Sequence, residues 1–137
     1  MAKATLLNRI FWVAGAAGAL SVCYLLCGHI FYELHGNKQW PLAMFIFGLA
    51  VILIAAFPGA KKAMVCTAAG YVVSFIAGIV FNSEYDYIVD GVLQDRRYTA
   101  WQIWTASYLG LIFAGIVWEI VSKRMKRKRG GYLYGNP

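Results

Sequence analysis

Residues 40–60 read WPLAMFIFGLAVILIAAFPGA and contain no Asp, Glu, Lys or Arg. The hydrocarbon core of a bilayer is about 30 Å thick, and a helix of about 20 apolar residues crosses it. This stretch has that length, so it predicts a membrane-spanning helix. Three further stretches of comparable length are also free of charge, at 10–32, 63–83 and 98–118. The sequence therefore predicts four membrane spans.

The composition supports the same interpretation. The chain has 137 residues, of which 61% are hydrophobic and only 14% are charged. Soluble domains have about 25% charged residues. A water-soluble fold of this length could not bury so much apolar surface, so the excess must face lipid. We expect one all-α membrane domain over residues 1–137, an antiparallel bundle of four transmembrane helices at 10–32, 41–57, 63–81 and 101–121.

The positions of the basic residues predict how the chain is oriented. Loops rich in Lys and Arg stay in the cytoplasm. If all four stretches cross the membrane, only Lys38, Arg96 and Arg97 lie on one side, and the other ten basic residues share the opposite side. We therefore expect both chain ends in the cytoplasm (N-in, C-in), in a multi-pass protein of the bacterial cytoplasmic membrane. The ten residues are Lys3, Arg9, Lys61, Lys62, Lys123, Arg124, Lys126, Arg127, Lys128 and Arg129.

The segment 123–137 is expected to form a basic cytoplasmic tail. Six of its first seven residues are basic, and each Lys or Arg near an anionic leaflet contributes about 1 kcal/mol to membrane binding. We expect anionic lipids as partners on this side. A charge run alone is not a nucleic-acid-binding motif, so no nucleic acid is expected. The predicted lipid contacts are Lys123, Arg124, Lys126, Arg127, Lys128 and Arg129.

Small residues recur every four positions in three of the predicted spans. In lipid, such spacing lets two helix backbones approach closely, because apolar side chains gain little by leaving lipid tails. We expect these three stripes to be helix-packing faces. They consist of Ala14 and Gly18 in the first span, Gly70, Ser74 and Gly78 in the third, and Ala106, Gly110 and Ala114 in the fourth.

The segment 82–98 is the longest extracytoplasmic connection. Its aliphatic residues Ile88, Val89, Val92 and Leu93 are spaced as in an amphipathic helix, which predicts one or two helical turns on the membrane surface. The segment also combines acids, arginines and tyrosines, a mixture suited to polar recognition. Exposed loops carry function more often than the elements they join. The predicted ligand or partner contacts are Glu84, Tyr85, Asp86, Tyr87, Asp90, Asp95, Arg96 and Arg97.

The sequence shows no arrangement typical of a cofactor or metal site. A bis-His haem needs two histidines that face each other from different helices, whereas His29 and His35 lie near the outer end of the same span. Glu33 lies four residues after His29 on the same helix face. We expect interfacial histidines, with no metal and no cofactor. Glu119 lies four residues before Lys123, an order that predicts an ion pair at the cytoplasmic interface.

Two functions remain open on the sequence. Because the span centres lack charge and no catalytic constellation is present, we expect a non-enzymatic accessory, regulatory or immunity-type interaction subunit. It would act as a homo-oligomer or with a larger membrane-protein partner. The alternative is a small oligomeric transporter or channel subunit, since four spans rarely enclose a path alone. Polar span residues would then line the path: Ser21, Thr67, Ser74, Thr105 and Ser107.

Overall fold

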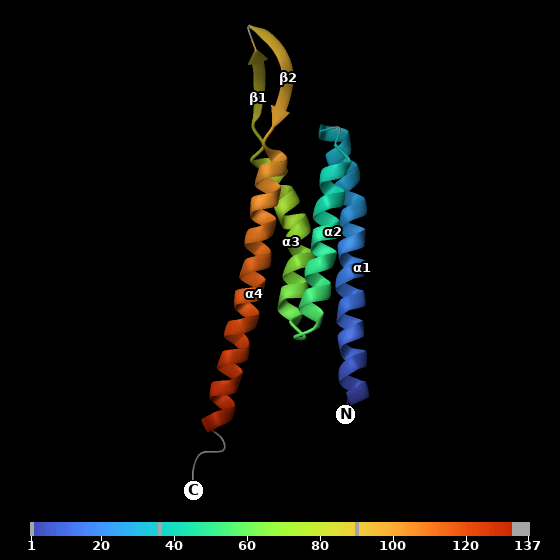
Figure 1. Cartoon of the computed structure of the whole chain (residues 1–137), viewed down its shortest axis with the longest axis vertical. Coiled ribbons are helices and arrows are strands. Elements are labelled where there is room, and N and C mark those ends of the chain that lie inside the picture. Colours follow the sequence, from blue (N-terminus) through green and yellow to red (C-terminus); the bar gives the residue numbers. More distant parts are fainter. Residues whose placement is uncertain (1, 36, 90, 133–137) are drawn as a thin grey trace.

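The computed structural model describes residues 2–35, 37–89 and 91–132, with four helices and one hairpin (Figure 1). The helices are α1 (Ala2–His35), α2 (Gln39–Ala56), α3 (Lys61–Val80) and α4 (Ala100–Tyr132). The strands β1 (Glu84–Val89) and β2 (Val92–Tyr98) lie between α3 and α4.

All four helices are long and apolar enough to cross a membrane, as the sequence predicts. The qualifying segments are Leu6–His35, Gln39–Ala56, Lys61–Val80 and Ala100–Lys126. The first and last helices extend beyond the predicted spans. α1 begins before residue 10, and α4 continues without a break from the span into the basic residues as far as Tyr132.

Consecutive helices run in opposite directions, and α3 lies between α2 and α4 (Figure 1). α1 packs on α2 and α3, whereas α4 packs mainly on α3. The start of α1, the link between α2 and α3, and the end of α4 all lie at one end, which we call the basic end. The hairpin projects from the opposite end, which we call the hairpin end.

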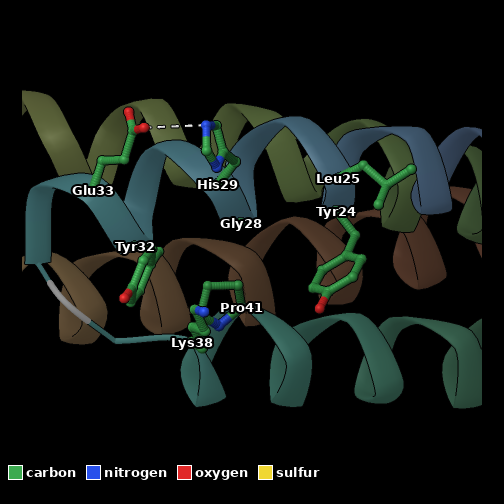
Figure 2. A pocket seen from close by; sticks show the side chains of 8 residues that line it. All are labelled: Tyr24, Leu25, Gly28, His29, Tyr32, Glu33, Lys38 and Pro41. Carbon is green, nitrogen blue, oxygen red and sulfur yellow. Dashed lines mark ion pairs between the residues drawn. The ribbon is translucent and has the colours of Figure 1, made fainter.

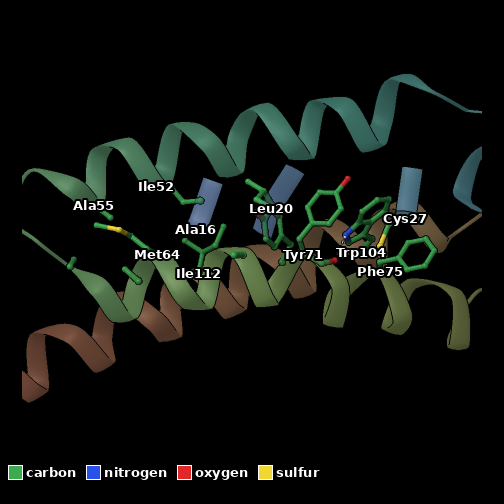
Figure 3. Packing of buried hydrophobic residues seen from close by; sticks show 14 of the residues in the cluster. Ala16, Leu20, Cys27, Ile52, Ala55, Met64, Tyr71, Phe75, Trp104 and Ile112 are labelled. Atoms are coloured by element: carbon green, nitrogen blue, oxygen red, sulfur yellow. Dashed lines mark hydrogen bonds between the residues drawn. The ribbon is translucent and has the colours of Figure 1, made fainter. Parts of the chain in front are cut away.

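The interior is filled by large aromatic side chains around α3 (Figure 3). Trp104, Tyr71 and Tyr108 are fully buried, and the ring of Tyr71 meets the other two edge-on at centroid distances of 5.2 and 5.7 Å. Trp104 Nε1 donates a hydrogen bond to the carbonyl of Tyr71 (3.2 Å), and the Tyr71 hydroxyl donates one to the carbonyl of Pro41 (2.9 Å). Two hydrogen bonds thus link α4 to α3 and α3 to α2 in a region where water supplies no partners.

The stripe of α3 lies against α4. A Cβ atom on Gly78 would lie 2.8 Å from the carbonyl oxygen of Ala100, and one on Gly70 would lie 3.2 Å from Leu111 Cβ. Ser74 is fully buried on the same face. Only small residues at these positions let the two helices come this close.

The other two stripes lie on exposed faces. Nothing among the described residues comes within 4 Å of a Cβ atom placed on Gly18 or Gly110. Ala14, Ala106 and Ala114 are exposed as well. The expectation of close packing is therefore not met for these stripes within one chain. The face of α4 that meets α3 carries Ala100, Trp104, Tyr108, Ile112 and Gly115 instead.

Glu119 joins two helices at the basic end. Its Oε2 accepts a hydrogen bond from the backbone N–H of Lys62 at the start of α3 (3.0 Å), and its Oε1 pairs with Lys123 Nζ (3.4 Å). The predicted Glu119–Lys123 ion pair is thus present. The contact with Lys62 is additional, and it places a carboxylate at a helix N-terminus, where backbone N–H groups lack partners and negative charge is favoured.

We predict that Gly78→Ala and Gly110→Ala shift stability in different directions. The added methyl of Gly78→Ala meets a backbone carbonyl that cannot turn aside, so the free energy of unfolding should fall by about 1–3 kcal/mol. Gly110→Ala meets open space and should be neutral or stabilising by up to about 1 kcal/mol, because Ala favours helix more than Gly. Thermal unfolding in mild detergent measures both. Equal melting temperatures for the two variants would contradict the α3–α4 contact.

Candidate interaction site at the hairpin end

The segment between α3 and α4 is a β-hairpin, so the predicted helical turns are wrong. β1 and β2 pair antiparallel with Val89 opposite Val92, and Gly91 lies in the turn that connects them. Gly91 has φ +78°, a value that favours glycine. Asp-Gly between β-branched residues is a strong signal for such a turn. The prediction of helical turns rests on the spacing of the aliphatic residues and does not take this turn signal into account.

The hairpin brings the predicted contact residues together on one ribbon. Glu84, Tyr85, Asp86 and Tyr87 lie on β1, and Asp95, Arg96 and Arg97 lie on β2; Asp90 lies outside the described residues. The register places Asp86 opposite Arg96 and Tyr85 opposite Arg97. Positions directly opposite each other in an antiparallel pair lie about 5 Å apart. One acidic position therefore lies directly opposite a basic one, and tyrosine positions lie opposite charged ones along the lower part of the ribbon.

The far end of the hairpin carries aliphatic residues. A register shift between Tyr87 and Ile88 makes a bulge, beyond which Ile88 lies opposite Leu93 and Val89 opposite Val92. The side chain of Ile88 is 59% exposed. We call these four residues the aliphatic tip. An exposed aliphatic residue on a hairpin that projects beyond the helices is a candidate contact for another molecule.

The base of the hairpin is held by hydrogen bonds that continue the two helices. Thr99 N donates to the carbonyl of Ser83 (3.1 Å), and Ser83 N donates to Thr99 Oγ1 (2.8 Å). Asn82 Oδ1 accepts from the backbone N–H of Ala100, the first residue of α4 (3.0 Å). These contacts join the end of α3 to the start of α4 and set the direction in which the hairpin leaves.

His35 connects α1 to the hairpin base. Its imidazole lies between the rings of Phe31 and Tyr98, at centroid distances of 4.7 and 4.8 Å. Both ring nitrogens are buried and have no hydrogen-bond partner among the described residues. The contact is therefore one of aromatic packing, and it is the point where the first helix meets the end of β2.

A second feature at this end is an open pocket of about 400 Å³ between α1 and α2 (Figure 2). Tyr24 and Tyr32 point from α1 towards α2, and Lys38 Nζ lies 4.2 Å from the centroid of the Tyr32 ring. His29 Nε2 pairs with Glu33 Oε1 at 3.1 Å on the rim. Both of these side chains are mostly exposed, so the pair is a surface contact of small energetic value.

The described residues contain no group of three His, Cys, Asp or Glu side chains that could hold a metal ion. Four helices that are long and apolar enough to cross a membrane indicate a multi-pass membrane protein. No protein-family model matches the chain, and neither the curated proteins nor the solved structures include a match. The function must therefore be argued from the geometry of this chain.

We predict that His35→Ala loosens the hairpin and that His35→Phe does not. Loss of an aromatic pair removes about 0.5–1.5 kcal/mol, which corresponds to roughly two- to twelve-fold faster amide exchange in β1 and β2. Hydrogen–deuterium exchange in detergent measures this rate. His29→Ala is the matched control, because His29 contacts only the exposed rim. Unchanged exchange in His35→Ala would show that His35 does not hold the hairpin.

Proposed function

We propose that this protein is a non-enzymatic interaction subunit of the membrane, whose hairpin contacts a protein partner outside the bilayer. The observation that carries the proposal is the aliphatic tip, presented at the far end of a ribbon that is held at its base. Burying an aliphatic side chain of this size contributes about 1.5–3 kcal/mol. The exposed side chain of Ile88, at an end of the hairpin whose sequence is aliphatic, therefore favours a partner with an apolar cleft.

The rest of the hairpin supports the same proposal. A two-stranded hairpin is marginally stable alone in water, and both of its outer edges carry backbone groups that can pair with a further strand. The charged and tyrosine positions below the tip would form the polar rim of such an interface, as is common around apolar contact centres. All of the contact residues predicted from the sequence, apart from Asp90, lie at these positions.

Contacts within the bilayer would complete the interaction. The stripes Ala14–Gly18 and Ala106–Gly110–Ala114 lie uncovered on α1 and α4, where helices of a second copy or of a larger membrane protein could pack closely.

We propose that the basic end faces the cytoplasm of a bacterial cell, with both termini inside. Lys123, Arg124 and Lys126 are exposed on α4 there, and the helical backbone continues through Arg127, Lys128 and Arg129. Anionic lipids would contact this stretch.

The orientation is testable by cysteine labelling in intact cells. Ile88→Cys, at the hairpin tip, should react with a membrane-impermeant maleimide added outside. Lys126→Cys should react only after permeabilisation. The parent chain is the background control, because Cys23, Cys27 and Cys66 lie within membrane-spanning helices. The reverse labelling pattern would contradict the proposed orientation.

A transport function is the second candidate. Ser74 Oγ and Tyr108 OH are buried without a hydrogen-bond partner among the described residues, as groups lining a polar path would be. Other polar span residues favour a structural role. The hydroxyls of Ser21, Thr67 and Thr105 each donate to the carbonyl four residues earlier in their own helix. Ser107 is half-buried on α4.

Complementation of a deletion strain separates the two candidates. The double variant Ile88→Ser/Leu93→Ser should abolish complementation with expression intact, because it removes the apolar contact. Neutralising Glu84, Asp86, Asp90 and Asp95 should weaken complementation. Leu34→Ser is the matched control, an exposed aliphatic residue at the same end but off the hairpin. Full activity of the hairpin variants together with loss in Ser74→Leu would favour transport.

A further inference from the structure

An apolar groove of about 450 Å³ opens between α2 and α4 at the basic end. Val51, Ile54 and Ala55 line it from α2, and Ile116 and Ile120 line it from α4. Lys123 lies at its polar end. The groove exists because α2 and α4 both pack on α3, while the floor between them is made of the small residues Ala60 and Ala63.

The groove faces the hydrocarbon of the bilayer, because its walls belong to membrane-spanning segments. An unfilled apolar groove would forfeit dispersion contacts along its walls. Its lining is apolar except for Glu119 and Lys123 at one end, which suits a hydrocarbon chain with a polar headgroup rather than a polar solute. The occupant that a bilayer supplies at this depth is a lipid acyl chain.

The polar end of the groove carries positive charge that is available for an anion. Lys123 Nζ donates to the carbonyl of Pro58 (2.9 Å) and pairs with Glu119 Oε1 (3.4 Å). An ammonium group has three N–H donors, so one donor remains. Glu119 also lines the groove, and its carboxylate balances the charge of Lys123, so the unbalanced positive charge beside the groove is that of Arg124. Arg124, the next residue, is exposed, and no acidic side chain among the described residues pairs with it.

We propose that the α2–α4 groove is a binding site for one anionic phospholipid, with an acyl chain in the groove and the phosphate bound by Lys123 and Arg124. The proposal goes beyond general attraction of the basic helix end to a charged surface, because it assigns one lipid to one groove. It does not rest on the function of the hairpin or on the orientation of the chain. Free phosphate has no acyl chain to occupy the groove, so a binding experiment can distinguish a bound lipid from a bound free anion.

Native mass spectrometry of the full chain in mild detergent tests the proposal. The chain is mixed with phosphatidylglycerol, with phosphatidylcholine of the same acyl chains, or with glycerol phosphate. One tightly held phosphatidylglycerol per chain is expected, with phosphatidylcholine bound several-fold more weakly and no retained glycerol phosphate. Equal retention of the two lipids would contradict the assignment of the headgroup site. Retention of glycerol phosphate would contradict the assignment of the acyl chain to the groove.

Paired variants locate the site. Val51→Trp fills the groove and should remove the bound lipid, whereas Leu53→Trp, at an exposed position on the same helix, should keep it. Lys123→Gln should weaken binding about fivefold, the effect of one basic residue near an anionic headgroup. Lys126→Gln removes the same charge outside the groove and should have little effect. Retention of the lipid by Val51→Trp, or equal loss in the two lysine variants, would show that the lipid binds elsewhere.

Discussion

The close approach of α3 and α4 at the hairpin end is the constraint on which the rest of the structure depends. Packed helices usually lie 8–10 Å apart, whereas neighbouring strands lie only 4.7–4.9 Å apart. The chain must therefore converge before a hairpin can begin. Gly78 permits this, because a side chain there would meet the carbonyl of Ala100. The Ser83–Thr99 and Asn82–Ala100 hydrogen bonds then bring the two segments together at the hairpin base.

Within the membrane, packing and internal hydrogen bonds hold the helices, because lipid tails are as apolar as the side chains they touch. The donor of Trp104 and the hydroxyl of Tyr71 find backbone acceptors on the neighbouring helices. These two contacts tie α4, α3 and α2 into one unit and leave α1 to pack from the side. Phe31 contacts Trp104 and His35 (centroids 5.2 and 4.7 Å), so the same aromatic cluster reaches the hairpin base. The aromatic cluster of the helix interior is thus continuous with the base of the hairpin.

The four spans are predictable from sequence because uninterrupted apolar length is a strong signal, as residues 40–60 show. Which face of a helix meets another is harder to predict. The stripes around Gly18 and Gly110 have the same spacing as the stripe around Gly78, yet among the described residues only the last meets another helix. Spacing of small residues indicates where close packing is possible, while the partner depends on aromatic residues such as Trp104. The hairpin is not predicted because the spacing of Ile88, Val89, Val92 and Leu93 fits a helix as well as the ends of two strands. Only the Asp-Gly pair between them indicates a hairpin.

The two ends of the molecule satisfy their polar groups in different ways, and this difference separates their roles. At the hairpin end, backbone groups pair with one another, so a ribbon can extend beyond the helices and present its side chains. At the basic end, cations from α1 and α4 donate to carbonyls of the link between α2 and α3, and a lysine of α3 donates to α1. Arg9 donates to the carbonyl of Phe57, Lys61 to Asn8 and Lys123 to the carbonyl of Pro58. Long basic side chains bridge a wider gap than backbone pairing does, so α2 and α4 can stay apart there. The apolar groove lies between these two helices over the small residues Ala60 and Ala63, and the Lys123 hydrogen bond to Pro58 spans its polar end.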